Sequence, residues 1–175
     1  MPRRQPLPSL WMMTDERQGE ALFAALRRLP EGAGVVFRHY GLGPGERRPL
    51  FDAVLRLARD KHQMLLLAGT AEEAVAWGAD GSHGRGPGAG LRSAPVHDAD
   101  EMRAAEAAGA ALLFLSPVFA TRSHPGAEPL GPARFDALAV QTQLPVIALG
   151  GMDEERFGLL ENAYGWAAID AWIRP

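Results

Sequence analysis

Short apolar runs recur along the chain, and most of them show no alternation of apolar and polar residues. Such a run is typical of a strand covered on both faces, as in the parallel sheet of an α/β protein. Between the runs, apolar residues at three- and four-residue spacing predict helices. The predicted strands are 9–14, 34–37, 64–68, 80–83, 91–97, 111–115, 145–149 and 165–171, and the predicted helices are 20–29, 48–61, 71–77, 98–108, 133–140 and 153–160.

Strand and helix alternate about eight times with short links, which favours parallel β/α units. Eight units is the number that closes a TIM barrel. The glycine-rich segment 84–90 cannot form a helix, so the crossover after the fourth strand is expected to be a loop. The last helix is expected to be missing. We therefore predict a small TIM (β/α)8-type barrel of the α/β class, with an open doubly wound sheet as the alternative.

The composition fits one soluble domain. The chain has 175 residues, of which 47% are hydrophobic, so we expect a single domain over 9–175 and a flexible, proline-rich leader over 1–8. The absence of cysteine excludes disulfides and thiolate chemistry. A net charge of −3 with interspersed signs argues against nucleic acid as a partner. No apolar stretch is long enough to span a membrane and no secretory signal is present, which predicts a cytoplasmic protein.

A polar connection follows the predicted strand 111–115. Past the end of this strand lie Ser116, Thr121, Ser123 and His124. The carboxyl ends of the strands carry the ligand sites of parallel barrels, and long connections in compact domains are uncommon unless they are functional or disordered. We therefore expect this loop to bind a ligand; a long solvated loop is the alternative.

Histidines gather at the same predicted edge. His39 ends the second strand, His83 the fourth and His97 the fifth, and His124 follows the sixth. An imidazole titrates near neutral pH and suits general acid–base chemistry, although each single histidine is equally compatible with a hydrogen-bonded surface role. The catalytic candidates are His124, His97 and His83.

Two glycines, Gly150 and Gly151, end the seventh predicted strand. They expose backbone amides, and a helix predicted from Asp153 adds its positive end, so an anion is expected here. Asp170, on the same edge, would repel that anion. The alternative is that the glycines only permit a tight turn. The predicted substrate-binding residues are Arg38, Ser116, Thr121, Ser123, Gly150, Gly151 and Asp170.

Five segments carry a resemblance to a known family. In order and spacing they are similar to the thiamine phosphate synthase and TenI (thiazole tautomerase) family of small β/α barrels. The resemblance implies a site for thiazole phosphate at the sixth-strand loop and at the ends of strands seven and eight. For the synthases, it also implies aminopyrimidine pyrophosphate held with Mg²⁺ near strands two to four. The matching segments are 10–15, 78–83, 116–123, 145–151 and 165–171.

This chain retains more of the family's residues in the thiazole half of the implied site than in the pyrimidine half. On the thiazole side, Thr121 and Ser123 keep the hydroxyl pattern, but His124 replaces a lysine and Asp170 replaces a phosphate-binding serine. On the pyrimidine side, segment 36–40 keeps only the arginine of the family's Gln-x-Arg-x-Lys string. The family's Asn-Asp-Arg string falls on 68–70, and its second metal-binding aspartate falls on Gly88. Both Mg²⁺ carboxylates are therefore missing, so we expect no metal cofactor and weak or lost synthase activity.

The resemblance thus implies a protein of thiamine biosynthesis that binds a thiazole or pyrimidine precursor. It would act as a synthase-like transferase or as a metal-independent, tautomerase-like isomerase, although TenI-type tautomerases use a histidine where this chain has Pro117. A non-catalytic binding or regulatory relative is the alternative, and a metal-dependent hydrolase ranks last. Trp166 and Trp172 lie near the flank left by the missing helix, which either a homodimer or the N-terminal leader could cover.

Overall fold

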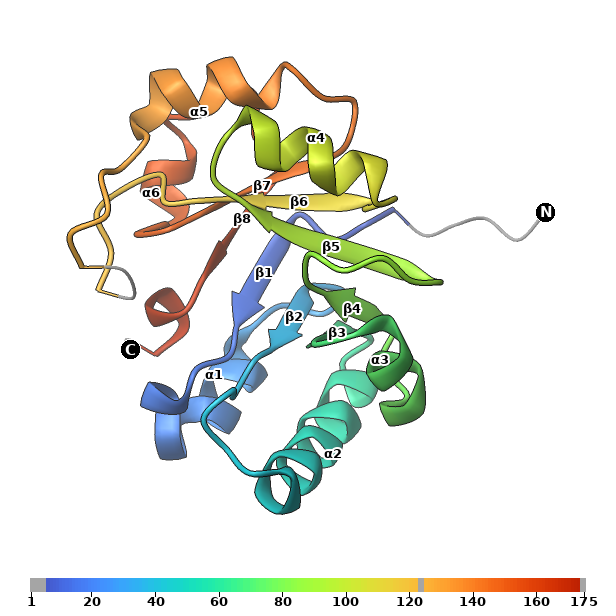
Figure 1. Cartoon of the computed structure of the whole chain (residues 1–175). Helices are drawn as coiled ribbons and strands as arrows, with labels where there is room; N and C mark the ends of the chain where they lie inside the picture. Colours follow the sequence, from blue (N-terminus) through green and yellow to red (C-terminus); the bar gives the residue numbers. More distant parts are fainter. Residues whose placement is uncertain (1–5, 123–124, 174–175) are drawn as a thin grey trace.

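The computed structural model describes residues 6–122 and 125–173, and its eight strands form one closed parallel barrel (Figure 1). Each strand pairs with its neighbours in sequence, and β1 pairs with β8 to close the ring. The predicted barrel is confirmed and the open-sheet alternative is wrong. The strands are β1 (Leu10–Met13), β2 (Gly34–Phe37), β3 (Met64–Ala68), β4 (Gly81–His83), β5 (Leu91–Val96), β6 (Leu112–Leu115), β7 (Val146–Leu149) and β8 (Gly165–Ala168).

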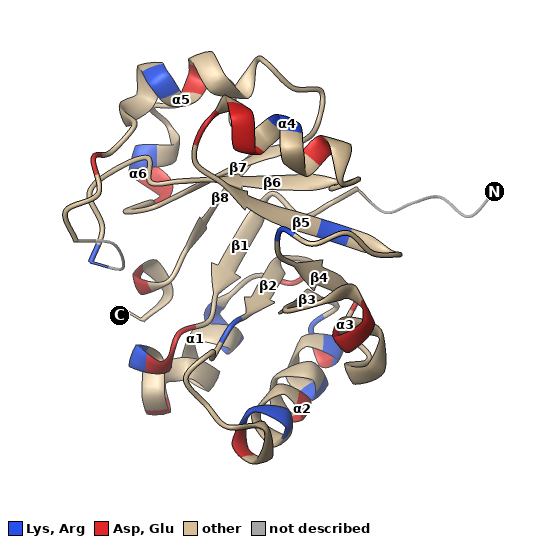
Figure 2. Cartoon of the chain, in the orientation of Figure 1, with Lys and Arg blue, Asp and Glu red and all other residues tan. Residues whose placement is uncertain are grey.

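Helices surround this ring. In Figure 1, α1 to α3 lie on one side of the barrel and α4 to α6 on the opposite side. Acidic and basic residues are interspersed over these helices in the view of Figure 2. The helices are η1 (Glu16–Ala21), α1 (Leu22–Arg28), α2 (Pro44–Asp60), α3 (Ala71–Trp77), α4 (Ala99–Ala107), α5 (Gly131–Ala139), α6 (Glu154–Phe157) and η2 (Asp170–Trp172), where η denotes a 3-10 helix.

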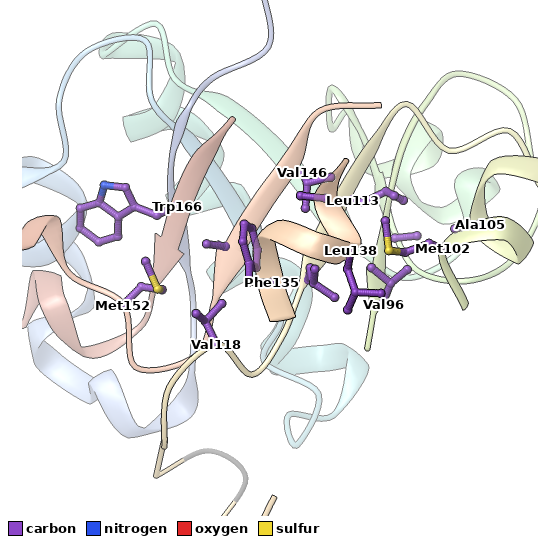
Figure 3. Close-up of a cluster of buried hydrophobic side chains, with 14 of the residues drawn as sticks. Val96, Met102, Ala105, Leu113, Val118, Phe135, Leu138, Val146, Met152 and Trp166 are labelled. Carbon is purple, nitrogen blue, oxygen red and sulfur yellow. The ribbon is translucent and has the colours of Figure 1, made fainter. Parts of the chain in front are cut away.

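The core has an inner layer and two outer layers. Trp11 fills the inside of the barrel, where its ring meets Phe114 edge-on at 5.4 Å. It lies opposite Gly34 in the register of β1 and β2, and a Cβ at Gly34 would come within 2.2 Å of the indole. Outside the ring, one apolar cluster packs beneath α1 to α3 and another beneath α4 and α5. Figure 3 shows the second cluster, with Phe135 of α5 among strand side chains.

Three predicted boundaries differ from the structure by three or more residues. Helix α2 starts four residues before the predicted 48, because Gly43 is extended and Pro44 suits the first helical position. Strand β8 stops at Ala168 rather than at 171, because Ile169 takes helical angles and begins the turn of η2. Helix α6 ends at Phe157, three residues short of the predicted 160. As a result, Asp170 lies past the end of its strand, at the barrel rim.

The crossover from β4 to β5 is a loop without a helix, as predicted. Arg92 of β5 covers the outer face at this point and is only 7% exposed. Its guanidinium donates to the carbonyl of Gly86 at 2.8 Å and to the carbonyl of Ala108 at the end of α4. One long side chain thus connects the two segments that a crossover helix would otherwise separate.

The segment after β8 folds back over the barrel. Trp172 stacks on Trp166 with ring centroids 5.4 Å apart and an interplanar angle of 11°. Arg28 of α1 donates to the carbonyl of Trp172 at 3.3 Å. The flank expected to be open is therefore at least partly covered by the chain itself, and the homodimer stays a prediction. Over the described ranges, no helix is long and apolar enough to cross a membrane.

Candidate functional site

A pocket of about 550 Å³ opens at the carboxyl ends of β6, β7 and β8. It brings together six of the seven predicted substrate-binding residues, and the seventh, Ser123, lies outside the described residues. The predicted loop after strand six therefore forms a wall of a real hollow rather than a purely solvated connection. The lining residues are Arg38, Ser116, Pro117, Thr121, Leu149, Gly150, Gly151, Met152, Ala168, Ile169, Asp170 and Ala171.

Gly150 and Gly151 allow the loops after β6 and β7 to touch. Both have positive φ angles, 101° and 62°. A Cβ on Gly150 would lie 2.7 Å from the Cα of Pro117, and one on Gly151 would lie 2.6 Å from the carbonyl oxygen of Ala120. The carbonyl of Gly150 accepts a hydrogen bond from the amide of Phe119 at 3.0 Å. No hydrogen bond between described residues uses the amides of Gly150 and Gly151, so these amides can serve a ligand.

Arg38 is held rigidly at the side of the pocket. Its Nε donates to the carbonyl of Thr14 at 2.8 Å, and its Nη2 donates to Oδ2 of Asp15 at 2.8 Å. Burial raises the pKa of Asp15, but hydrogen bonds from Arg17 and the charges of Arg38 and Arg17 outweigh burial, so this pKa is lowered overall. Asp15 is therefore ionised at neutral pH and fixes one edge of the guanidinium, and among described residues Nη1 has no hydrogen-bond partner.

Thr14 and His39, absent from the predicted site, support Arg38 from below. The Thr14 hydroxyl accepts the backbone amide of Arg38 at 2.9 Å and lies 2.9 Å from Nδ1 of His39. His39 is 4% exposed and has a φ of 41°, an unusual backbone angle for a residue other than glycine. Burial lowers its pKa. The signals in the sequence were the polar end of the first strand and the position of His39 at the end of the second. The direction of these side chains could not be predicted, because it depends on the register of β1 and β2.

A second hollow of about 770 Å³ adjoins the pocket and shares Asp170 with it. Arg122 pairs with Asp170 at 3.2 Å. Asp153 accepts the backbone amide of Arg156 at 2.8 Å and thereby caps α6, which has only four residues. This helix end therefore offers little positive charge to an anion, in contrast to the prediction. The second hollow is lined by Ala120, Thr121, Arg122, Gly151, Met152, Asp153, Arg156, Asp170 and Ala171.

The candidate histidines do not gather around the pocket. His83 is 5% exposed, bonds to Oγ of Ser93 at 2.8 Å and meets Phe114 edge-on inside the barrel. Burial, with the nearby charge of Arg38, lowers the pKa of His83 to about 3. His97 is exposed and turned toward α4, where Nδ1 lies 2.8 Å from Oε2 of Glu101. Neither histidine is among the residues that line the pocket, which does not support the catalytic roles predicted for them. His124 lies outside the described residues.

Lysine-based imine chemistry is excluded at this rim. Lys61 is the only lysine in the chain. It follows α2, next to the amino end of β3, and its ammonium donates to the carbonyls that end α1, including that of Leu26 at 3.4 Å. The rim pocket therefore has hydroxyls, backbone amides, guanidinium groups and a carboxylate, but no amine nucleophile from lysine.

The fold and the pocket define the class: a small β/α barrel with a pocket at the carboxyl ends of its last three strands. The sequence pattern of the family described as "Thiamine monophosphate synthase" (TMP-TENI) matches residues 93–171, a range that includes every lining residue of both hollows except Arg38. The chain belongs to the thiamine monophosphate synthase family.

Comparison with individual proteins supports this membership. The "Putative thiamine-phosphate synthase 2" of Aquifex aeolicus is 31% identical, across 95% of this chain and 98% of that protein. A "Thiamine-phosphate synthase" of Chlorobium luteolum is 30% identical, across 94% of this chain and 84% of that protein. The solved thiamine phosphate pyrophosphorylase of Pyrococcus furiosus is 22% identical, with a TM-score of 0.79 over 95% of this chain and 87% of that chain, which shows a shared fold.

The end of β3 does not suit the Mg²⁺ that the resemblance implies for synthases. Arg47 donates to the carbonyl of Ala68 at 2.7 Å and pairs with Glu73 at 3.4 Å, so a cation already holds this strand end together with the adjacent carboxylate. A Cβ at Gly69 would lie 2.4 Å from Oε2 of Glu73, and one at Gly88 would lie 2.3 Å from Cβ of Ala71. Among described residues, no three His, Asp or Glu side chains form a metal-ligand group.

Proposed function

We propose that this protein binds a small thiazole, or a similar heterocycle derived from a thiamine precursor, in the pocket at the ends of β6, β7 and β8. The observation that carries the proposal is the convergence of Ser116, Thr121 and the free amides of Gly150 and Gly151 on one hollow. Apart from Arg38, the residues that line this hollow belong to the part of the chain that matches the family pattern. Arg38 supplies a fixed hydrogen-bond donor from the opposite side.

The donors in the pocket suit a flat, polar ring. Hydroxyls and backbone amides orient heteroatoms, whereas Leu149, Met152 and Ile169 provide apolar surface for the ring. The Asp15–Arg38 pair fixes the guanidinium before a ligand arrives, so little side-chain ordering is needed on binding. We therefore expect one heterocycle to be bound by residues that are already in position.

Metal-dependent synthase activity is proposed to be weak or lost. Departure of a pyrophosphate requires neutralisation of the charge that develops on it, which Mg²⁺ commonly supplies in phosphoryl chemistry. At the end of β3, Glu73 is the partner of Arg47, and both positions of the implied metal site carry glycine, of which Gly88 has no room for a side chain because a Cβ there would lie 2.3 Å from Cβ of Ala71. A binding or regulatory protein without catalysis is the second candidate, favoured by this crowding and by the burial of His83.

Calorimetric titration with thiazole ligands, with and without a phosphate group, tests the binding proposal. Arg38→Met should weaken binding by tenfold or more, on the order of one lost charged hydrogen bond. Arg48→Met is the control, because Arg48 also pairs with an aspartate, Asp52 at 2.9 Å, but lies on α2 outside the pocket. If neither thiazole binds, the proposal fails.

A turnover assay separates the two candidate functions. The protein is incubated with thiazole phosphate and aminopyrimidine pyrophosphate, with Mg²⁺ or with a chelator, and thiamine phosphate is measured by mass spectrometry. We expect little product in either condition. Product that forms at an ordinary synthase rate and requires Mg²⁺ would show that the metal site is functional despite its crowding. Conversion of a thiazole alone would identify an isomerase.

A further inference from the structure

We propose that Asp170 makes this site prefer a ligand that carries a hydroxyl or amino group over one that carries a phosphate. The inference rests on the proposed function, and it specifies the chemical class of the ligand. Asp170 lines both hollows, together with Thr121, Gly151, Met152 and Ala171. Residues common to two adjoining hollows lie where they meet, so a ligand group that extends from the pocket into the outer hollow passes the Asp170 carboxylate.

Two of the three arginines that line the two hollows are already paired with carboxylates. Arg38 pairs with Asp15 at 2.8 Å, and Arg122 pairs with Asp170 itself at 3.2 Å. Arg156 donates to the carbonyl of Gly151 and lies over the ring of Phe119 at 5.1 Å. A doubly charged phosphate is bound well where guanidinium groups are free to meet it. Here it would compete with Asp15 for Arg38 and with Asp170 for Arg122.

The pocket instead suits a ligand that carries a hydrogen-bond donor near Asp170. The oxygens of a phosphate dianion only accept hydrogen bonds, so they cannot satisfy the Asp170 carboxylate, and two like charges at close range repel. An alcohol or a protonated amine donates to that carboxylate. The amides of Gly150 and Gly151 remain free for an acceptor elsewhere on the same ligand. Arg122 donates to Oδ2 of Asp170, and among the described residues Oδ1 has no hydrogen-bond partner, so this oxygen can accept from a ligand.

The test compares two probes: a thiazole with a primary alcohol and the phosphate ester of that alcohol. Calorimetric titration of the full chain at low salt measures both dissociation constants. We expect the alcohol to bind more tightly than the ester, by on the order of tenfold, which is the effect of one close charge interaction near a protein surface. Asp170→Asn should remove or reverse this preference.

Two further variants make the result specific. Arg122→Gln removes the cation that pairs with Asp170 and should increase the ratio of the ester's dissociation constant to that of the alcohol. This change is opposite to the one expected for Asp170→Asn. Asp52→Asn is the matched control, because Asp52 has a similar exposure of 37% and also has one arginine partner, but lies on α2. It should leave the ratio of the two constants unchanged.

The outcomes separate the inference from the proposed function. Tighter binding of the ester by the wild-type chain, or an unchanged ratio in Asp170→Asn, overturns the inference and leaves the binding proposal intact. Failure of both probes to bind overturns both. If Asp170→Asn does not fold, as judged from its thermal unfolding, the Arg122→Gln result decides, because a ratio that does not widen contradicts the inference.

Discussion

Burial gives His83 a proton affinity unlike that of an exposed histidine. Its ring lies inside the barrel against Phe114 and bonds to Ser93, and its pKa of about 3 keeps it neutral at physiological pH. A general base works best when its pKa lies near the working pH. His83 therefore shapes the barrel interior beneath the pocket rather than exchanging protons with a ligand.

This neutral histidine predicts a pH dependence of stability. Because the pKa of His83 is about 3 in the folded chain and 6.5 ordinarily, the unfolded chain binds more protons between these values. The free energy of unfolding should fall as the pH decreases below about 6.5, by up to ~1.4 kcal/mol per pH unit for this group. His39, whose pKa is also lowered by burial, adds to the slope. Denaturant unfolding at pH 7, 6 and 5 measures it.

The matched substitutions isolate the contribution of His83. His83→Asn should reduce the slope between pH 6.5 and 5, whereas His62→Asn, at a side chain that is 78% exposed, should leave it unchanged. Carboxylates with lowered pKa values, such as Asp15, also contribute to the free energy of unfolding, but they lose this contribution only when the pH falls below their ordinary pKa near 4. They therefore do not affect the slope between pH 6.5 and 5. An unchanged slope in His83→Asn would contradict the role given to burial.

At the scale of elements, the contact between the β6 and β7 loops holds the pocket together. Gly150→Ala places a methyl group 2.7 Å from the backbone of Pro117 and also strains a φ of 101°. We expect a loss of roughly 2–4 kcal/mol in the free energy of unfolding, together with weaker ligand binding. Gly32→Ala is the control, since its φ is 74° but nothing lies within 4 Å of the new Cβ. Equal losses of stability in both variants would mean that the close contact between the loops after β6 and β7 does not contribute to stability.

Arg92 covers the barrel at the β4–β5 crossover, where the other crossovers have a helix. Arg92→Ala removes the stem that covers β5 and the hydrogen bonds to Gly86 and Ala108. It should lower the free energy of unfolding by roughly 2–3 kcal/mol, as expected when a buried side chain loses its packing and two partly buried hydrogen bonds from a charged group. Arg103→Ala, at a side chain that is 66% exposed, should cost less than about 0.5 kcal/mol. Similar losses of stability in the two variants would show that Arg92 is not needed to stabilise the loop between β4 and β5. Chemical denaturation of both variants measures the difference.

At the scale of the whole molecule, local signals were enough to predict the barrel. Strand β3 and helix α3 lie where the pattern placed them, because Thr70 caps the helix and Gly78 ends it with a left-handed angle. Once the strands were in order, the rim positions of Ser116 and Gly150 followed from the parallel topology.

Side-chain directions could not be predicted in the same way. His83 and His97 both follow from the pattern as residues at strand ends, but one turns into the barrel and the other toward Glu101. The support of Arg38 by Thr14 depends on how β1 and β2 are aligned, which no local pattern specifies. Site geometry therefore required the three-dimensional structure even where the site residues themselves were found.

The pairing of β1 with β8 has a consequence for how the chain reaches its native state. All other strand pairs join neighbours in sequence, so they can form early at small entropic cost, whereas this pair joins the two ends of the ring. Until it forms, two unpaired strand edges are exposed that can attach to other chains. Refolding yield from denaturant should therefore decrease as protein concentration rises, and recovery should be best in dilute solution.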